Sequence, residues 1–176
     1  MLRTFIIVLL VGGIVAAAPP DPASRSATLA KQLTAALAEQ RLEAIAAQHP
    51  DEPDRFVAAL FFANTQLLVV SARYASPLLL QAKLTQKQYR EVYLDLQVSP
   101  VPNSSVFFQD MKADGLCSSR DQTADLLYDG SAAPTIFDGD WRKHNLSETE
   151  YERQRTTADE RYSRLLEILL AQQRGT

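Results

Sequence analysis

Cysteine, histidine and glycine are all scarce in this sequence. Its 176 residues include one cysteine, Cys117, two histidines and six glycines. A single cysteine cannot form an intramolecular disulfide, so the fold must be stabilised by packing, and we interpret Cys117 as a small buried side chain. His49 and His144 are far apart and belong to no close group of ligand residues, so the sequence predicts no metal site.

Motifs for nucleotide and hydrolase chemistry are also missing. There is no glycine-rich phosphate loop and no Gly-x-Ser-x-Gly turn. Cys117 as a nucleophile would need a positioned base, and the two histidines are both distant in sequence. No catalytic residue can therefore be named from the sequence.

An excess of positive charge is lacking as well. The chain has 18 lysines and arginines against 21 aspartates and glutamates, a net charge of −3. Proteins that bind nucleic acid or anionic membranes rely on a positive excess. We therefore expect neither nucleic acid nor membrane as a partner of the mature chain.

The N-terminus has the three parts of a secretory signal peptide. Arg3 precedes an apolar stretch over residues 5–15, and three alanines follow. The stretch is shorter than the roughly 20 residues that a membrane-spanning helix needs. Pro19 disfavours cleavage after Ala18, so we predict cleavage after Ala17.

This cleavage defines the expected organisation of the chain. Residues 1–17 are the signal peptide, residues 18–24 a proline-rich leader, and residues 25–173 a single domain of ordinary size. The mature protein is expected in the periplasm or outside the cell.

The first part of the domain is predicted to be helical. Ser24 or Ser26 can cap a helix that runs to residue 48 and ends before Pro50. Its apolar residues lie on two offset stripes, so the helix is expected to bend or to contact two surfaces. The first stripe is Leu29, Leu33, Ala36 and Leu37, and the second is Leu42 and Ile45.

A β-hairpin is predicted next. Residues 56–62 and 66–70 are almost continuously apolar and are separated by a short connection containing Asn64. Because the apolar residues do not alternate with polar ones, both strands are expected to be covered on two faces.

The middle of the chain is predicted to hold short elements. A helix over 76–88 precedes strands over 92–96 and 106–109, and the second strand ends in a turn over 112–115. Residues 118–134 show weak periodicity and are predicted to form a loop. Asp138-Gly139 is typical of a type I′ turn and predicts a tight hairpin.

The last helix has the clearest pattern. Ser147 and Glu150 form a capping box. One apolar face follows, whereas Arg161 lies off that face and is expected to be solvated. The face consists of Tyr151, Ala158, Tyr162, Leu165, Leu166 and Leu169. The order of elements favours an α+β fold, with an N-terminal and a C-terminal helix packed on a mainly antiparallel sheet.

One group of residues could bind an anion. Arg73 follows the second hairpin strand, Ser76 begins the predicted helix over 76–88, and Lys83 lies two turns further along. A guanidinium and the free amides of a helix N-terminus both favour negative charge. The alternative is structural: Ser76 caps the helix, and Arg73 and Lys83 face water.

The region over residues 55–116 resembles the flavin-binding split-barrel family, which includes pyridoxamine-phosphate oxidases. The resemblance rests on the strand ending Leu67-Leu-Val-Val-Ser71-Ala-Arg73, the helix from Ser76 with Lys83, and the strands over 91–95 and 106–109. It implies a split barrel that binds FMN, with Arg73, Ser76 and Lys83 holding the flavin phosphate. Pro77 and Leu78 stand where the family has basic residues.

Two functional hypotheses follow. The first is an exported, non-enzymatic domain that binds a protein partner or a small ligand and needs no cofactor. The second is an FMN-binding split-barrel oxidoreductase or a degenerate relative of one. Segments 56–74, 110–116 and 137–141 also resemble exported bacterial proteins without an assigned function, which adds no mechanism.

Overall fold

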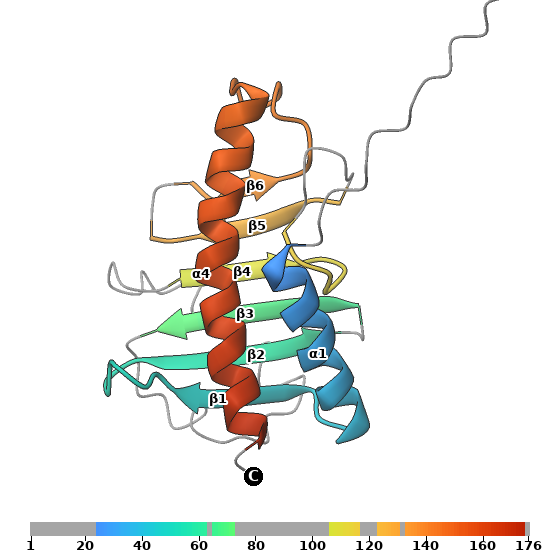
Figure 1. Cartoon of the computed structure of the whole chain (residues 1–176), viewed down its shortest axis with the longest axis vertical. Helices are drawn as coiled ribbons and strands as arrows, with labels where there is room; N and C mark the ends of the chain where they lie inside the picture. Colours follow the sequence, from blue (N-terminus) through green and yellow to red (C-terminus); the bar gives the residue numbers. More distant parts are fainter. Residues whose placement is uncertain (1–23, 63–64, 73–105, 117–122, 131–132, 175–176) are drawn as a thin grey trace, which may run out of the picture.

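The computed structural model describes residues 24–62, 65–72, 106–116, 123–130 and 133–174. In these residues six strands form one antiparallel sheet, and each strand pairs with its neighbours in sequence (Figure 1). The strands are β1 (Ala44–Gln48), β2 (Phe56–Phe62), β3 (Gln66–Ala72), β4 (Val106–Asp110), β5 (Asp125–Tyr128) and β6 (Thr135–Phe137). The helices are α1 (Arg25–Glu39) and α4 (Glu148–Arg174).

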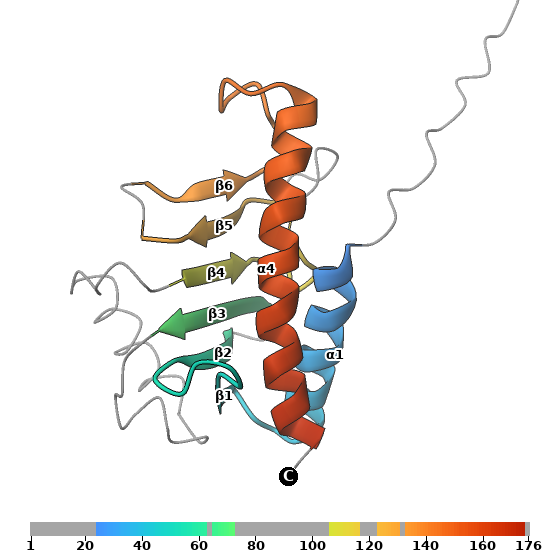
Figure 2. The same ribbon diagram turned by 60° about the vertical axis from the view of Figure 1, so that its left-hand side comes forward.

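Both helices lie on one face of the sheet, and α4 crosses all six strands (Figures 1 and 2). They also contact each other: the Ser26 hydroxyl donates to the Asp159 carboxylate, and Arg25 pairs with Glu167. The predicted α+β fold with terminal helices on an antiparallel sheet is therefore confirmed. The sheet is open, since β1 and β6 form its opposite edges.

The main core lies between the sheet and the two helices. Alternate strand residues such as Val57, Leu67 and Phe108 point into it, as the period of two in a strand requires. A second, smaller cluster contains Ala44, Ala58, Leu60 and Leu68. These residues alternate with the first set along β2 and β3, so they lie on the opposite face. The prediction that both hairpin strands are buried on two faces is confirmed.

The predicted helix over 24–48 is wrong beyond Glu39. Arg41 has a φ of 55°, and the Leu42 amide donates to the Leu37 carbonyl at 2.8 Å. This is a Schellman ending, in which one left-handed residue closes the helix. The chain then enters β1, so Ile45 of the second apolar stripe belongs to a strand that pairs with β2, and Leu42 lies in the connection before it.

Two predictions for the region after β4 are also wrong. Residues 118–134 are not all loop, because they contain β5, which pairs with both β4 and β6. Asp138-Gly139 does not make a hairpin. Gly139 has a φ of 77°, but the turn leads from β6 towards α4 instead of into a returning strand. The predicted helix over 76–88 and strand over 92–96 lie outside the described residues.

The prediction of a C-terminal helix with one buried apolar face is confirmed, and the predicted capping box is present in part. The Ser147 hydroxyl accepts a hydrogen bond from the Glu150 amide at 3.1 Å, and the predicted apolar face is buried. Tyr162 stacks on Phe108 of β4 with ring centroids 4.8 Å apart. The Glu150 carboxylate pairs with Arg153. Of the two hydrogen bonds of a capping box, the structure therefore contains the one to the serine hydroxyl.

The turn after β4 joins the sheet to both helices. The Asp110 carboxylate accepts hydrogen bonds from the amides of Asp114 and Gly115, at 3.0 and 2.9 Å, and from the Tyr162 hydroxyl of α4 at 3.2 Å. Gly115 has a φ of 92°, and a Cβ there would lie 2.6 Å from the Ala27 amide nitrogen of α1. Only glycine allows this close approach.

Candidate functional site

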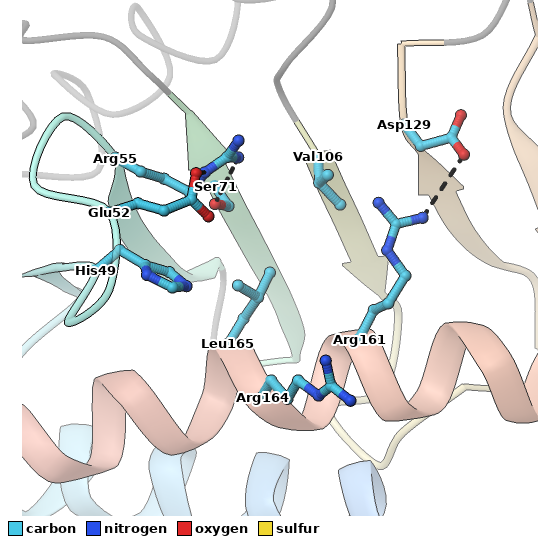
Figure 3. A pocket seen from close by; sticks show the side chains of 9 residues that line it. All are labelled: His49, Glu52, Arg55, Ser71, Val106, Asp129, Arg161, Arg164 and Leu165. Carbon is cyan, nitrogen blue, oxygen red and sulfur yellow. Dashed lines mark hydrogen bonds and ion pairs between the residues drawn. The ribbon is translucent and has the colours of Figure 1, made fainter.

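A cavity of about 360 Å³ opens where the ends of several strands meet the middle of α4 (Figure 3). Among the described residues, nine side chains line it, and Figure 3 labels all of them. They come from the connection between β1 and β2, from β3 and β4, from the residue after β5, and from α4. The cavity thus gathers residues from five separate places in the sequence.

Strand pairing places the sheet side of the cavity. The β1–β2 hairpin is closed by a hydrogen bond from the His49 amide to the Arg55 carbonyl at 2.8 Å. Ser71 of β3 pairs with Val57 on one side and with Val106 on the other. Neighbouring strands run antiparallel, so one strand ends where the next begins. One side of the sheet therefore holds the end of β1, the start of β2, the end of β3 and the start of β4.

Arg55 is held in a fixed position at this side of the sheet, just before β2. Its Nε lies 2.9 Å from Oε2 of Glu52, and its Nη1 donates to Oγ of Ser71 at 3.3 Å. The Arg55 side chain is only 14% exposed, and Ser71 is buried. A guanidinium with these contacts and little exposure is held in a defined orientation.

The helix side of the cavity adds two more arginines (Figure 3). Arg161 reaches Asp129 across the cavity, with Nη1 and Oδ2 3.6 Å apart and both side chains about half exposed. A pair of this kind contributes little to stability and can rearrange. Arg164 makes no hydrogen bond or ion pair with any residue that the structure describes. Leu165 supplies an apolar wall.

The described lining carries a positive excess, with three guanidinium groups against the carboxylates of Glu52 and Asp129. The imidazole of His49 and the hydroxyl of Ser71 add hydrogen-bonding groups. Arginine presents paired N–H donors whose spacing matches carboxylate and phosphate oxygens. The arrangement is therefore suited to holding a small anion. Among the described lining residues, no hydrogen bond joins a nucleophilic side chain to a base.

The sequence predicts a different anion site, formed by Arg73, Ser76 and Lys83. Arg73, Ser76 and Lys83 lie outside the described residues. Strand β3 ends at Ala72, and its Ser71 is part of the lining.

Sequence reasoning missed the arginines that the structure brings together. Arg161 was expected to be solvated; it is half exposed, but it lines the cavity. A usable signal existed: Arg161 and Arg164 are three residues apart on the same side of the helix, next to the buried Leu165. Arg55 at the start of a buried strand was a second signal.

The other histidine lies at a separate turn. His144 Nε2 is 2.9 Å from Asp138 Oδ1, beside a cavity of about 220 Å³ that Tyr151 also lines. Burial raises the pKa of Asp138, but hydrogen bonds from His144 and the Asp140 amide outweigh it, so the net pKa is lowered. In the described residues, no group of three or more histidine, cysteine, aspartate or glutamate side chains could hold a metal ion.

Comparisons with known proteins supply no relative from which a function could be transferred. No protein-family model matches the chain, and no curated protein or solved structure matches it. None of the helices in the described ranges is both long and apolar enough to cross a membrane. The function must be argued from the cavity itself.

Proposed function

We propose that the protein is an exported, non-enzymatic domain that binds a small anionic ligand in the cavity lined by Arg55, Arg161 and Arg164. The observation that carries this proposal is the position of Arg164. Arg164 lines the cavity and makes no hydrogen bond or ion pair with any described residue, and Arg55 and Arg161 line the same cavity.

The three arginines would act differently on the ligand. Arg55 is nearly buried and already oriented, so it would bind an anion without first losing side-chain freedom. Arg161 would exchange its exposed contact with Asp129 for the ligand at little cost. Arg164 would supply the charge that the cavity leaves uncompensated. Val106 and Leu165 would contact an apolar part of the ligand.

Thermal unfolding with inorganic phosphate as the probe tests this function. At about ten times the dissociation constant, the ligand should stabilise the native protein by about 1.4 kcal/mol. For a domain of this size, that free energy raises the midpoint by about 4 °C. Arg164→Gln should lose this increase, whereas Lys31→Gln on the exposed surface of α1, with the same change in charge, should keep it.

The paired variants separate binding from a general salt effect, because phosphate also stabilises proteins by exclusion from their surface. Exclusion would raise the midpoints of wild type and Arg164→Gln equally, and that result would contradict a site at the cavity. FMN belongs in the same titration. A midpoint that rises with FMN but not with phosphate would favour the flavin-binding alternative through Arg73, Ser76 and Lys83.

Export is proposed on the N-terminal pattern of residues 1–17. N-terminal sequencing of the mature product should begin at Ala18. An intact Met1 on protein recovered from the cytoplasmic fraction would contradict export.

A further inference from the structure

The first cavity, lined by Arg55, Arg161 and Arg164, adjoins a second cavity of about 800 Å³ along α4. His49, Glu52 and Arg164 line both cavities. The second cavity lies between the β1–β2 connection and the last three turns of the helix. Because the two share lining residues, a ligand bound by the arginines can extend into the second cavity without leaving the protein surface.

The lining of the second cavity is chemically mixed. Ala47, Pro50, Ile168 and Ala171 offer small apolar contacts, and Gln48 and Gln172 contribute carboxamides. Carboxamides donate and accept hydrogen bonds, as peptide groups do. A mixture of this kind suits a chain that alternates peptide groups with side chains better than it suits a continuous hydrocarbon.

The two cavities differ in the sign of their charge. The lining of the first has three guanidinium groups and two carboxylates, whereas that of the second has the carboxylates of Asp51, Glu52 and Glu167 and the guanidinium of Arg164. Glu52 and Arg164 belong to both linings, and Glu52 pairs with Arg55 of the first cavity. Asp51 is exposed, and its carboxylate has no ion-pair partner in the described part of the chain. Glu167 pairs with Arg25 at the rim. A ligand with an anion at one end and a cation nearby, within reach of Asp51, therefore complements both cavities.

Building on the proposed function, we infer that the ligand is a short peptide with a free C-terminal carboxylate and a basic side chain next to it. The carboxylate lies in the first cavity against Arg55, Arg161 and Arg164. The first cavity has room for about a dozen water-sized groups, enough for a carboxylate and one small side chain. The basic side chain lies in the second cavity near Asp51.

Isothermal titration calorimetry with three tripeptides tests this assignment. The peptides are N-acetylated, because acetylation removes the charge of the N-terminus. The probes are Ala-Lys-Ala with a free carboxylate, the same peptide as its C-terminal amide, and Ala-Glu-Ala with a free carboxylate. We expect the first to bind, and the other two to bind about tenfold more weakly, since each loses or reverses one charge contact. The amide probes the arginine cavity, and the glutamate peptide probes the second cavity.

Variants assign each charge to its cavity. Asp51→Asn should weaken Ala-Lys-Ala binding about threefold and leave phosphate binding unchanged, because Asp51 lines only the second cavity. Arg164→Gln should weaken both. Glu39→Gln, an exposed carboxylate on α1, is the matched control for Asp51→Asn and should change neither.

The two proposals fail in different ways. Equal binding of Ala-Lys-Ala and Ala-Glu-Ala, with no effect of Asp51→Asn, would overturn the peptide assignment while phosphate binding through Arg164 stands. If Arg164→Gln changed the affinity neither for phosphate nor for any of the three peptides, the anion site would be overturned as well.

Discussion

Asp110 lies in an environment unlike that of an ordinary surface carboxylate. It is fully buried, and burial raises its pKa from 3.8 to about 6 despite the hydrogen bonds from the amides of Gly115 and Asp114 and from the Tyr162 hydroxyl. The neighbouring charge of Asp114 raises the pKa further. Desolvation together with the acidic neighbours Asp110, Asp125 and Asp159 also raises the pKa of Tyr162, which therefore stays neutral and donates to Asp110.

This raised pKa predicts a pH dependence of stability. Because the folded state binds the Asp110 proton more tightly than the unfolded state does, the stabilisation is fully present below the unfolded pKa and is lost as pH rises through about 6. From about pH 4 to pH 7, the free energy of unfolding of the wild type should fall by about 2 kcal/mol relative to that of Asp110→Asn, which lacks this titrating group.

Chemical denaturation at a series of pH values measures the shift. The comparison uses the change with pH and not the absolute stability, because the asparagine amide cannot replace every hydrogen bond of the carboxylate. Parallel curves for wild type and variant would mean that Asp110 titrates in its ordinary range.

At the level of elements, the apolar face of α4 should contribute more to stability than its cap. Ser147→Ala removes one hydrogen bond to the helix N-terminus and should cost about 1 kcal/mol. Leu169→Ala leaves a cavity under a fully buried side chain and should cost about 2–5 kcal/mol. Denaturation of the two variants measures both, and a larger loss from Ser147→Ala would contradict the docking of α4 through its apolar face.

The same elements show what the sequence could predict. The hairpin β2–β3, strand β4 and helix α4 have long or regular apolar patterns, and all were predicted correctly. The end of α1 was not, because Arg41 occupies the left-handed position where glycine usually marks a helix end. Strand β5 has four residues, too few for its alternation to be distinguished from a loop.

The candidate site was harder to predict for a different reason. Arg55 and Arg161 are more than a hundred positions apart, and only the crossing of α4 over the sheet brings them to one cavity. In the sequence, Arg161 looks like any solvated residue beside a buried helical face. Charge patterns along a helix report exposure, but they do not report which neighbouring element faces the exposed group.

At the level of the whole molecule, α4 links structure and function. It packs against α1, covers the sheet as far as β6, and provides Arg161, Arg164 and Leu165 to the cavity (Figures 1 and 3). Its buried face fixes the position of the exposed arginines opposite the strand ends. Binding at the cavity would therefore join the connection between β1 and β2 to the middle of this helix.

The most direct measurement of the central claim is an NMR titration of isotope-labelled protein with phosphate, following the backbone amides and the arginine Nε–H groups. Binding in the cavity predicts that the largest changes occur in residues 49–55, at Ser71 and in residues 161–165, and that Arg55, Arg161 and Arg164 dominate among the arginines. Changes concentrated around residues 138–147, or spread evenly over surface arginines such as Arg142 and Arg153, would contradict a specific anion site at this cavity.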